Sequence, residues 1–236
     1  MNSLIRTGRQ LYHSISDLLF PPSCVQCQRL NVWLCLACAE TWPLFTGPLC
    51  VRCGRPLPVP DICPGCRTHP LQLSTVRSAL IFEGAIRDAL HALKYRGGRQ
   101  TAVPLAQVMA HAWAYHGLTS NVLMPVPLFP QREAQRGYNQ ATLLAKALGR
   151  ILRLPVASQV LTRVRNTPSQ TKLDKAARKH NVAGAFALRE SLDLTGWRVT
   201  LIDDVATTGA TLDACAAVLL ASGATEVHAF TLARAP

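Results

Sequence analysis

Eight of the nine cysteines of this 236-residue chain lie between residues 24 and 66, in four Cys-x-x-Cys pairs. The pairs are Cys24/Cys27, Cys35/Cys38, Cys50/Cys53 and Cys63/Cys66. A Cys-x-x-Cys turn presents two thiolates on one side of the chain, and two such turns complete a tetrahedral site suited to zinc. The segment is therefore expected to fold around two zinc ions, with none of its cysteines left over.

Residues 24–38 and 50–66 form an internal repeat, because each contains two of these pairs separated by a short spacer. The repeat predicts two consecutive sites, but a crossed arrangement that joins Cys24/Cys27 to Cys50/Cys53 uses the same residues and stays open. Redox centres are the weaker alternative, since none of the pairs opens a helix after a strand as a thioredoxin-like motif does. A site made only of thiolates has no open position, so the zinc is expected to be structural. A module this small is expected to fold only with its metal.

Composition and the first 20 residues indicate the compartment. Hydrophobic residues make up 49% and charged residues 16%, which excludes a disordered chain. No apolar run approaches the about 18–20 residues of a membrane span. Apolar residues at helical spacing predict an amphipathic docking helix over 1–20, and the charges within it argue against a signal peptide. We expect a cytoplasmic protein, where a reducing environment favours zinc over disulfides.

The rest of the chain has the pattern of an α/β domain. Following the docking helix and a double zinc ribbon over 21–70, this domain is expected to occupy 71–236. Apolar runs predict strands at 75–82, 122–127, 199–202 and 227–233. Helical periodicity predicts helices at 85–93, 102–115, 139–152 and 211–221. Strands that alternate with helices favour a parallel sheet flanked by helices.

The stretch after the third predicted strand is the most informative part of this domain. An apolar strand ends in Asp203 and Asp204, and a turn rich in hydroxyls then leads into a helix. Ligands of open α/β sheets bind at the carboxyl ends of strands, where the N–H groups of the next helix suit a phosphate. Gly209 lets the backbone approach that anion closely. Two carboxylates suit the vicinal hydroxyls of a ribose, so the stretch predicts a ribose-5-phosphate site; a merely capped helix would need only one such residue.

This stretch resembles the phosphoribosyl-diphosphate (PRPP) motif of type I phosphoribosyltransferases. The resemblance implies that Asp203 and Asp204 hold the ribose hydroxyls and serve catalysis, that Thr207 to Thr211 hold the 5-phosphate, and that Mg²⁺ accompanies PRPP. The PRPP-binding residues it implies are Asp203, Asp204, Val205, Ala206, Thr207, Thr208, Gly209, Ala210 and Thr211.

Further motifs narrow the resemblance to one family. Their residues are Lys94-Tyr95-Arg96-Gly97, Val126-Pro127-Leu128 with Arg132, Arg136-Gly137-Tyr138-Asn139-Gln140, and Thr167, Gln170, Leu173, Arg178 and Asn181. Together with the cysteine module, they make the chain similar to the ComF/GntX family. The resemblance implies a type I phosphoribosyltransferase-like protein of natural competence, or of the use of imported DNA. Such a protein handles incoming single-stranded DNA in the cytoplasm, with DNA-import or recombination proteins as further partners.

A basic segment accounts for most of the formal net charge of +12. Between Arg132 and Asn181 the chain has eleven Lys and Arg residues against Glu133 and Asp174. Arg132, Arg136 and Arg178 are the candidates for the diphosphate of PRPP. One diphosphate does not need eleven cations, so the surplus favours a nucleic-acid backbone. Tyr138 is the only aromatic residue of the segment, which indicates phosphate attraction with weak sequence preference.

Three functions remain open from the sequence. The first is a PRPP-binding protein of DNA use without turnover, and the second is an active transferase that moves ribose-5-phosphate to an unidentified acceptor and releases diphosphate. The third, a purine-sensing transcriptional regulator, lacks a helix-turn-helix signature. Cys215 is expected to be a buried small hydrophobe. The lone histidines lack metal-site spacing and are expected to be structural; they are His91, His111 and His116.

Overall fold

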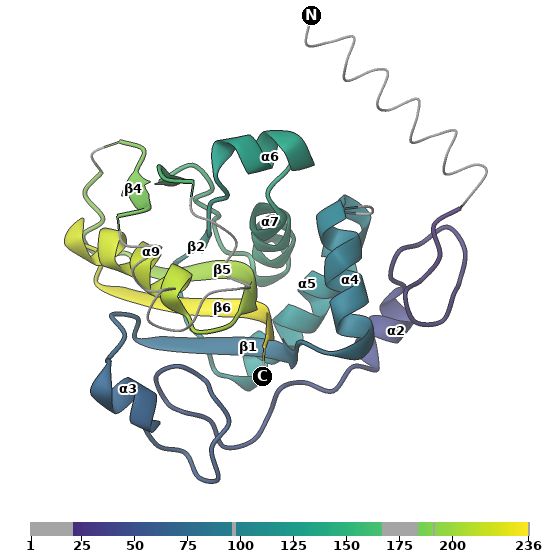
Figure 1. Cartoon of the computed structure of the whole chain (residues 1–236), viewed down its shortest axis with the longest axis horizontal. Coiled ribbons are helices and arrows are strands. Elements are labelled where there is room, and N and C mark those ends of the chain that lie inside the picture. Colours follow the sequence, from purple (N-terminus) through teal and green to yellow (C-terminus); the bar gives the residue numbers. More distant parts are fainter. Residues whose placement is uncertain (1–20, 96–97, 167–183, 191, 236) are drawn as a thin grey trace, which may run out of the picture.

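The computed structural model describes residues 21–95, 98–166, 184–190 and 192–235 (Figure 1). In chain order the elements are α2 (Leu36–Glu40), α3 (Pro64–Thr68), β1 (Thr75–Ile81), α4 (Gly84–Tyr95), α5 (Gly98–Tyr115), β2 (Val122–Pro125), α6 (Pro130–Arg136), α7 (Gln140–Leu152), β3 (Leu161–Arg163), β4 (Phe186–Leu188), β5 (Arg198–Ala206), α9 (Ala210–Ala221) and β6 (Glu226–Arg234).

The centre of the molecule is a parallel sheet with the strand order β1-β6-β5-β2. Its inner strands are almost continuously apolar, because helices cover both faces and leave no solvated side. Val199, Leu201 and Ile202 of β5 are fully buried, as is Phe230 of β6. β3 and β4 form a separate antiparallel pair.

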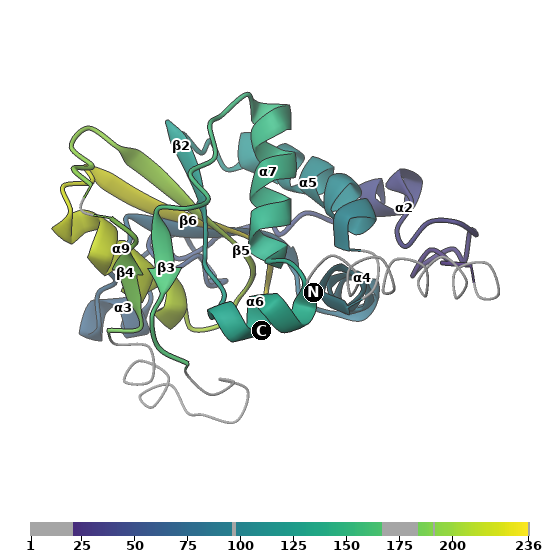
Figure 2. The same cartoon turned by 90° about the horizontal axis from the view of Figure 1, so that it is seen from above.

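The two faces of the sheet carry different layers. Helices α4, α5 and α7 pack on one face, and α9 packs on the other together with the β3–β4 pair (Figure 2). On the first face the Trp113 ring of α5 meets the Phe230 ring edge to face, with 5.6 Å between centroids. On the second face Cys215 of α9 is completely buried among apolar side chains, which confirms its predicted role as a small hydrophobe.

The two halves of the cysteine module lie in different places (Figure 1). The first half, with α2, joins the main core beside α5 through Leu34, Ala39 and Trp42. The second half, with α3, lies along the edge strand β1, where the Val76 N–H donates to the carbonyl oxygen of Arg52 at 2.7 Å. The module is therefore packed against the sheet domain at two separate points.

The parallel sheet and its helices confirm the predicted α/β architecture, with one correction. The sequence places the end of the third strand at Ile202, but β5 continues to Ala206. Its partner β6 is equally long and supplies ladder partners as far as Ala206, which pairs with Arg234. Asp203 and Asp204 therefore lie within the strand and are held by the sheet. Helix α6 and the β3–β4 pair were not predicted, because they are short and lack a clear period.

Some predictions fall outside the described residues. These are the docking helix over 1–20, Arg96 and Gly97, and the family motif residues Thr167, Gln170, Leu173, Arg178 and Asn181. Among the residues that the structure describes, none of the helices combines the length and the apolar character that crossing a membrane requires.

Candidate zinc centres and anion-binding site

The eight clustered cysteines form two separate groups, as the consecutive pairing predicts. Cys24, Cys27, Cys35 and Cys38 make one group, and Cys50, Cys53, Cys63 and Cys66 make the other. Within each group all four sulfur atoms lie within 4.8 Å of one another. The crossed arrangement is therefore wrong.

The sulfur spacing fits tetrahedral zinc. The Sγ atoms of Cys24 and Cys35 are 3.8 Å apart, and those of Cys53 and Cys63 are 3.7 Å apart. Zinc–sulfur bonds of about 2.3 Å in a tetrahedron give sulfur–sulfur edges of about 3.8 Å. A disulfide would need about 2.05 Å. Both groups therefore fit structural zinc, and every ligand position is filled by a thiolate.

Backbone amides support the thiolate form at the equivalent position of each centre. The Cys35 N–H lies 3.5 Å from Cys24 Sγ, and the Cys63 N–H lies 3.3 Å from Cys50 Sγ. Burial raises the pKa of Cys24 and of Cys50, but the backbone N–H donors around each sulfur outweigh it and lower both pKa values to about 6. Thiolate is the form that binds metal, so the fold prepares Cys24 and Cys50 for zinc. In the absence of metal, a neighbouring thiol raises the pKa of Cys38, and burial raises the pKa values of Cys53 and Cys66.

Arginines surround the second centre. Four thiolates and one Zn²⁺ carry a net charge of −2, so a buried centre needs compensating cations. Arg234 of β6 is only 6% exposed, and its guanidinium donates to the Cys53 carbonyl oxygen at 2.7 Å. Arg77 of β1 donates to the carbonyl oxygens of Cys50, at 3.4 Å, and Val51, at 3.3 Å. Edge and inner strands thus both hold this half of the module.

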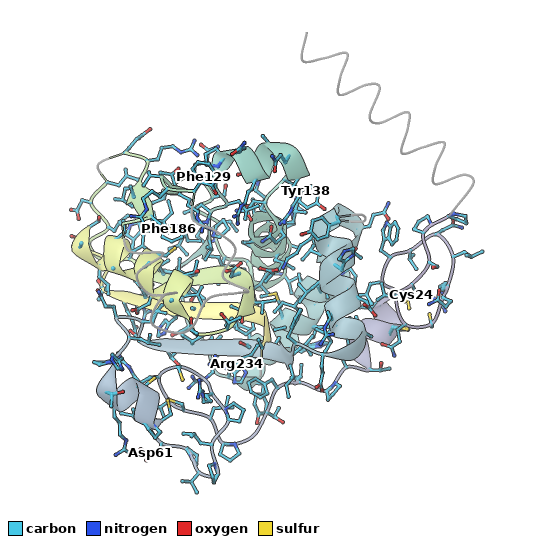
Figure 3. The ribbon with its side chains drawn as sticks, in the orientation of Figure 1. Cys24, Asp61, Phe129, Tyr138, Phe186 and Arg234 are labelled. Atoms are coloured by element: carbon cyan, nitrogen blue, oxygen red, sulfur yellow. The ribbon has the colours of Figure 1, made fainter. Side chains whose placement is uncertain are left out.

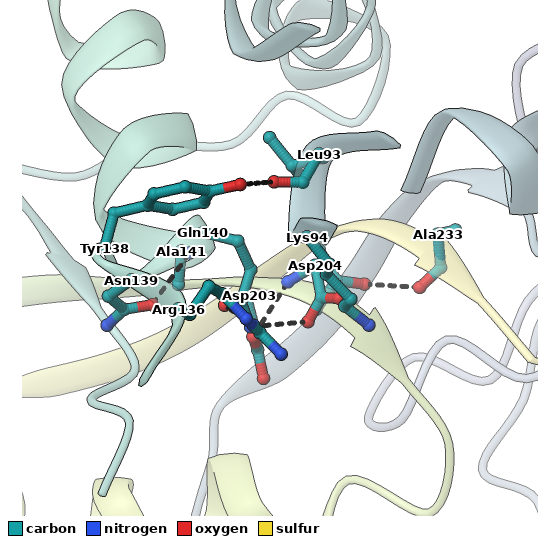
Figure 4. A network of polar contacts seen from close by, with 11 residues as sticks. Leu93, Lys94, Arg136, Tyr138, Asn139, Gln140, Ala141, Asp203, Asp204 and Ala233 are labelled. Carbon is teal, nitrogen blue, oxygen red and sulfur yellow. Dashed lines mark hydrogen bonds and ion pairs between the residues drawn. The ribbon is translucent and has the colours of Figure 1, made fainter. Parts of the chain in front are cut away.

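A second group of polar side chains lies at the carboxyl end of β5 (Figure 4). Asp204 is buried and forms an ion pair with Lys94, the penultimate residue of α4. Its other carboxylate oxygen lies 3.5 Å from the amide nitrogen of Gln140, at the start of α7. The Asp203 carboxylate accepts the backbone N–H of Asp204 at 2.8 Å. Residues from α4, α7 and β5 therefore meet at one point.

The pKa values of the two carboxyl groups are shifted in opposite directions. Burial and the like charge of Asp204 raise the pKa of Asp203 well above its usual value. Burial also acts to raise the pKa of Asp204, but the ammonium of Lys94 outweighs it, so this pKa is lowered. Of the two carboxyl groups, Asp204 is therefore the one that ionises first as the pH rises. A hydroxyl group or a cation that contacts Asp203 would stabilise its carboxylate form and offset the cost of burial.

The turn after β5 contains a left-handed glycine with open space beside it. Gly209 has φ +82°, a left-handed conformation that favours glycine, and a Cβ there would meet no atom within 4 Å. Thr207 is exposed, and the Thr208 hydroxyl accepts the Ala210 N–H at 3.4 Å. Ala210 and Thr211 begin α9. Asp213, the acidic residue of its first turn, accepts the Gln72 N–H at 2.6 Å.

Side-chain hydrogen bonds hold the N-terminus of α7 next to these residues (Figure 4). The Asn139 side chain caps α7 by accepting the Ala141 N–H at 2.9 Å, and it donates to the Val126 carbonyl oxygen at 2.9 Å. The Tyr138 hydroxyl donates to the Leu93 carbonyl oxygen at 2.8 Å, one residue before Lys94. The loop before α7, which includes Tyr138 (Figure 3), is thus tied to the residue that follows β2 and to α4.

The predicted cations are placed only in part. Arg132 and Arg136 lie on α6 and are partly exposed. The Arg136 guanidinium donates to the Gln140 side chain and stacks over the Tyr95 ring, 5.2 Å from its centroid. Arg178 lies outside the described residues.

Three members of the site were not singled out as site residues from the sequence: Lys94, Gln140 and Arg163. Lys94 and Gln140 stand within motifs that carry the family resemblance, and this was the available signal. Arg163 of β3 is 9% exposed and lies over the Phe186 ring, and the charge of Asp203 acts on it. It was counted only among the basic residues. Together, Lys94 and Arg163 bring positive charge to the two carboxylates.

The histidines behave as predicted where the structure gives their contacts. His116 Nε2 lies 3.2 Å from the Ser78 carbonyl oxygen, and the His91 ring packs against Tyr95 with 4.8 Å between centroids. Neither belongs to a cluster of metal ligands among the described residues.

These features define a class of protein, in which a double zinc ribbon is joined to a parallel α/β domain. At the carboxyl end of an inner strand, this domain has two acidic residues followed by a turn rich in hydroxyl groups. The family model described as Double zinc ribbon domain matches residues 15–67. Over 227 residues the chain is 31% identical to DNA utilization protein YhgH of Salmonella typhimurium, covering 92% of this chain and 99% of the relative. It is 33% identical to Competence protein ComFC of Bacillus subtilis over 209 residues, 85% of this chain and 84% of the relative. The chain belongs to the ComF family, which confirms the resemblance.

A solved structure with a similar arrangement is glutamine phosphoribosylpyrophosphate amidotransferase of B. subtilis, complexed with ADP and GMP. It is 17% identical, with a TM-score of 0.39, over 58% of this chain and 29% of that chain. A TM-score this low identifies no ligand, so the ligand is inferred from the residues of the turn after β5. The parallel sheet, its flanking helices and the double zinc ribbon confirm the predicted α/β domain behind a zinc-ribbon module.

Proposed function

We propose that the protein binds PRPP with Mg²⁺ at the carboxyl end of β5, and that it serves the handling of imported single-stranded DNA in the cytoplasm. The observation that carries the PRPP proposal is the juxtaposition of Asp203 and Asp204 with the open left-handed turn at Gly209. The carboxylates of Asp203 and Asp204 offer acceptors for two hydroxyl groups, and the turn leads into a helix N-terminus that suits a phosphate. Both are features that ribose-5-phosphate combines in one molecule.

Each part of PRPP has a partner in this arrangement. Asp203 and Asp204 accept the ribose hydroxyls, and the backbone and hydroxyls of residues 207–211 hold the 5-phosphate. Arg132 and Arg136 on α6, with Arg178, are the proposed partners of the diphosphate. Mg²⁺, when bound with PRPP, would supply further neutralisation of the diphosphate charge.

Lys94 keeps Asp204 from being an unpaired buried charge before the ligand arrives. Its ammonium neutralises Asp204 in the free protein. The Lys94 side chain is 27% exposed, so an anionic ligand can reach its ammonium group. The cationic surroundings therefore suit a ligand that brings hydroxyls to the acids and negative charge to the lysine.

The DNA part of the proposal is supported by family membership and charge. The relatives are named for DNA utilization and for competence. The formal net charge of +12 suits a polyanionic partner. DNA-import or recombination proteins are proposed as further partners in the same process.

Turnover is the second candidate function, favoured by the cations that face the proposed diphosphate. In a transferase the bond between the anomeric carbon and the diphosphate oxygen breaks, the diphosphate leaves with the bonding electrons, and an acceptor forms the new bond to that carbon. Preorganised cations stabilise the charge that develops on the leaving group. The acceptor would have to bring its own nucleophile.

Calorimetric titration of the zinc-loaded protein with PRPP and Mg²⁺ tests binding. We expect saturable binding by the wild type, and binding at least about 100-fold weaker for D203N/D204N, since hydrogen bonds to charged groups contribute about 1.5–3 kcal/mol each. D88N is the matched control, because Asp88 is an exposed carboxylate of α4. No heat from the wild type, or equal binding by D203N/D204N, would contradict the proposal. Diphosphate release on adding nucleobases or DNA distinguishes turnover from binding alone.

A further inference from the structure

One span of the chain, here called the basic flank, is almost free of negative charge. Between Asp88 and Asp174 the chain has a single acidic residue, Glu133. This span includes α5, β2, α6, α7 and β3. Cations of this flank therefore have few acidic neighbours along the chain.

A groove lies on this flank at the C-terminal end of α7. Its volume is about 460 Å³, and its lining residues are Lys146, Gly149, Arg150, Arg153, Leu154, Pro155 and Val156. We call it the α7 groove. It contains three cations and no acid. All three cationic side chains belong to exposed residues, and the floor contributed by residues 154–156 is apolar.

The α7 groove is separate from the candidate PRPP site. Helix α7 begins at Gln140, beside Asp204, and ends at Leu152. Thirteen residues at 1.5 Å each put its ends about 20 Å apart. Residues 155–157 after the helix pair with Leu123, near the start of β2, so the groove lies toward the amino end of the sheet. The PRPP site lies at the opposite, carboxyl end.

The spacing of the cations favours a polymer over a small anion. Lys146 and Arg150 stand four residues apart, which places them on one face of the helix, about 6 Å from one to the next along its axis. The row continues to Arg153, which adopts a left-handed conformation with φ +56° at the end of the helix. A single phosphate needs a convergent pocket, whereas a row of charges matches the repeated phosphates of a strand.

We propose that the α7 groove binds the phosphate backbone of single-stranded nucleic acid, with sugars or bases resting on the apolar floor. The choice of nucleic acid among polyanions rests on the proposed function in DNA use. The apolar residues 154–156 beside the cations favour a single strand over a duplex, because the unpaired bases of a single strand can contact them. Lys146, the groove residue nearest to Gln140 in the chain, lies about 9 Å along α7 from it, and the rest of the groove lies farther away, so the strand and PRPP are bound at the same time.

Fluorescence anisotropy with a labelled oligothymidylate of twenty residues tests the groove in the full-length, zinc-loaded protein. The test variant is K146Q/R150Q/R153Q. The matched control is R29Q/R189Q/R198Q, which removes the same number of exposed cations from other parts of the molecule. At about 0.1 M salt we expect the test variant to bind about 100-fold more weakly, because each lost phosphate contact removes about 0.7 of a log unit. The control should stay within a few-fold of the wild type.

The salt dependence gives a second readout. The slope of log affinity against log salt should decrease by about 2 in the test variant, since three contacts at about 0.7 each are removed. Equal weakening of test and control variants would overturn the proposal, because it would show that net charge alone attracts the strand. Duplex DNA of the same length bound as tightly as the oligothymidylate would also overturn it. So would a wild type that binds no oligothymidylate at this salt concentration.

Titration of PRPP separates this proposal from the one on which it rests. We expect K146Q/R150Q/R153Q to bind PRPP as the wild type does, and saturating PRPP to leave the affinity for the oligothymidylate within about twofold. Competition between PRPP and the strand would overturn the α7 groove as the binding place. A wild type that binds the strand through the groove but never binds PRPP would refute the PRPP site and leave the groove proposal supported.

Discussion

Arg234, at the end of the last strand, donates a hydrogen bond of 2.7 Å to the carbonyl oxygen of Cys53, 181 residues earlier in the chain. This contact joins the inner strand β6 to a turn that carries two ligands of the second zinc centre. The Arg234 residue also pairs with Ala206, where β5 ends. The second centre is thus connected to the strand that carries Asp203 and Asp204.

Loss of the Arg234 guanidinium should loosen the second zinc centre. In R234M a charge-assisted hydrogen bond worth about 1.5–3 kcal/mol is removed and the centre loses a compensating charge. We expect one of the two zinc ions to leave to a chelator at least about 10-fold faster, followed by a colorimetric zinc indicator. R198M, at an exposed arginine, is the control. R234K, which keeps the charge, should lie in between; release of both ions at the wild-type rate would contradict this coupling.

Each of the two cysteine centres should bind one zinc ion independently of the other. Because the sulfur atoms form two groups of four, C27S and C53S each remove one ligand from one centre. Elemental analysis should give about two zinc ions per wild-type chain, about one for each single variant and none for C27S/C53S. A single ion in the wild type would be incompatible with two filled centres.

Lys94 and Asp204 should stabilise each other. Removing one partner of a buried ion pair costs about 3–5 kcal/mol, and the partial exposure of Lys94 reduces this figure. Chemical unfolding of K94M, D204N and K94M/D204N should give a coupling free energy of about 1–2 kcal/mol, with the double variant more stable than the sum of the single changes predicts. Additive effects would mean that the pair contributes nothing.

Replacing Asp203 should stabilise the ligand-free protein at neutral pH. Its raised pKa means that the folded state disfavours the charged form, so stability is full below the ordinary pKa of 3.8 and declines as the pH rises through the folded-state pKa. D203N removes that decline. We expect thermal melting at neutral pH to rise by a few degrees, at about 2–4 °C per kcal/mol for a chain of this size.

The gain from D203N should depend on pH. Near pH 3.8 the wild-type carboxyl is protonated in the folded state, so wild type and D203N should melt at similar temperatures. Asp204 has the opposite sign: its lowered pKa contributes stability above 3.8, and this is lost as the pH falls through its folded-state value. A gain from D203N that grows toward acid pH would contradict this assignment.

The sequence predicts the local features of this fold well. Four Cys-x-x-Cys pairs at regular spacing predict both zinc centres, because their ligands are close in the chain. Apolar runs and helical periods locate the sheet and its main helices. The end of β5 was predicted four residues early, since it depends on how far the distant strand β6 continues.

The candidate site could be predicted only in part for the same reason. Asp203 and Asp204 stand out because they follow an apolar strand. Their partners Lys94 and Arg163 come from α4 and β3, and only the folded chain brings them near. The α7 groove likewise arises where the helix C-terminus meets residues 154–156, and one of its cations depends on the left-handed backbone of Arg153.

The position of the second zinc turn against β1 has a consequence for the fate of the metal-free chain. β1 is an edge strand, and the backbone of Arg52 occupies one of its outward-facing N–H groups, at Val76. An uncovered edge offers unpaired backbone groups to another molecule's strand. Removal of zinc by a chelator should therefore expose the edge of β1. The metal-free protein should then self-associate through this strand before the sheet itself unfolds.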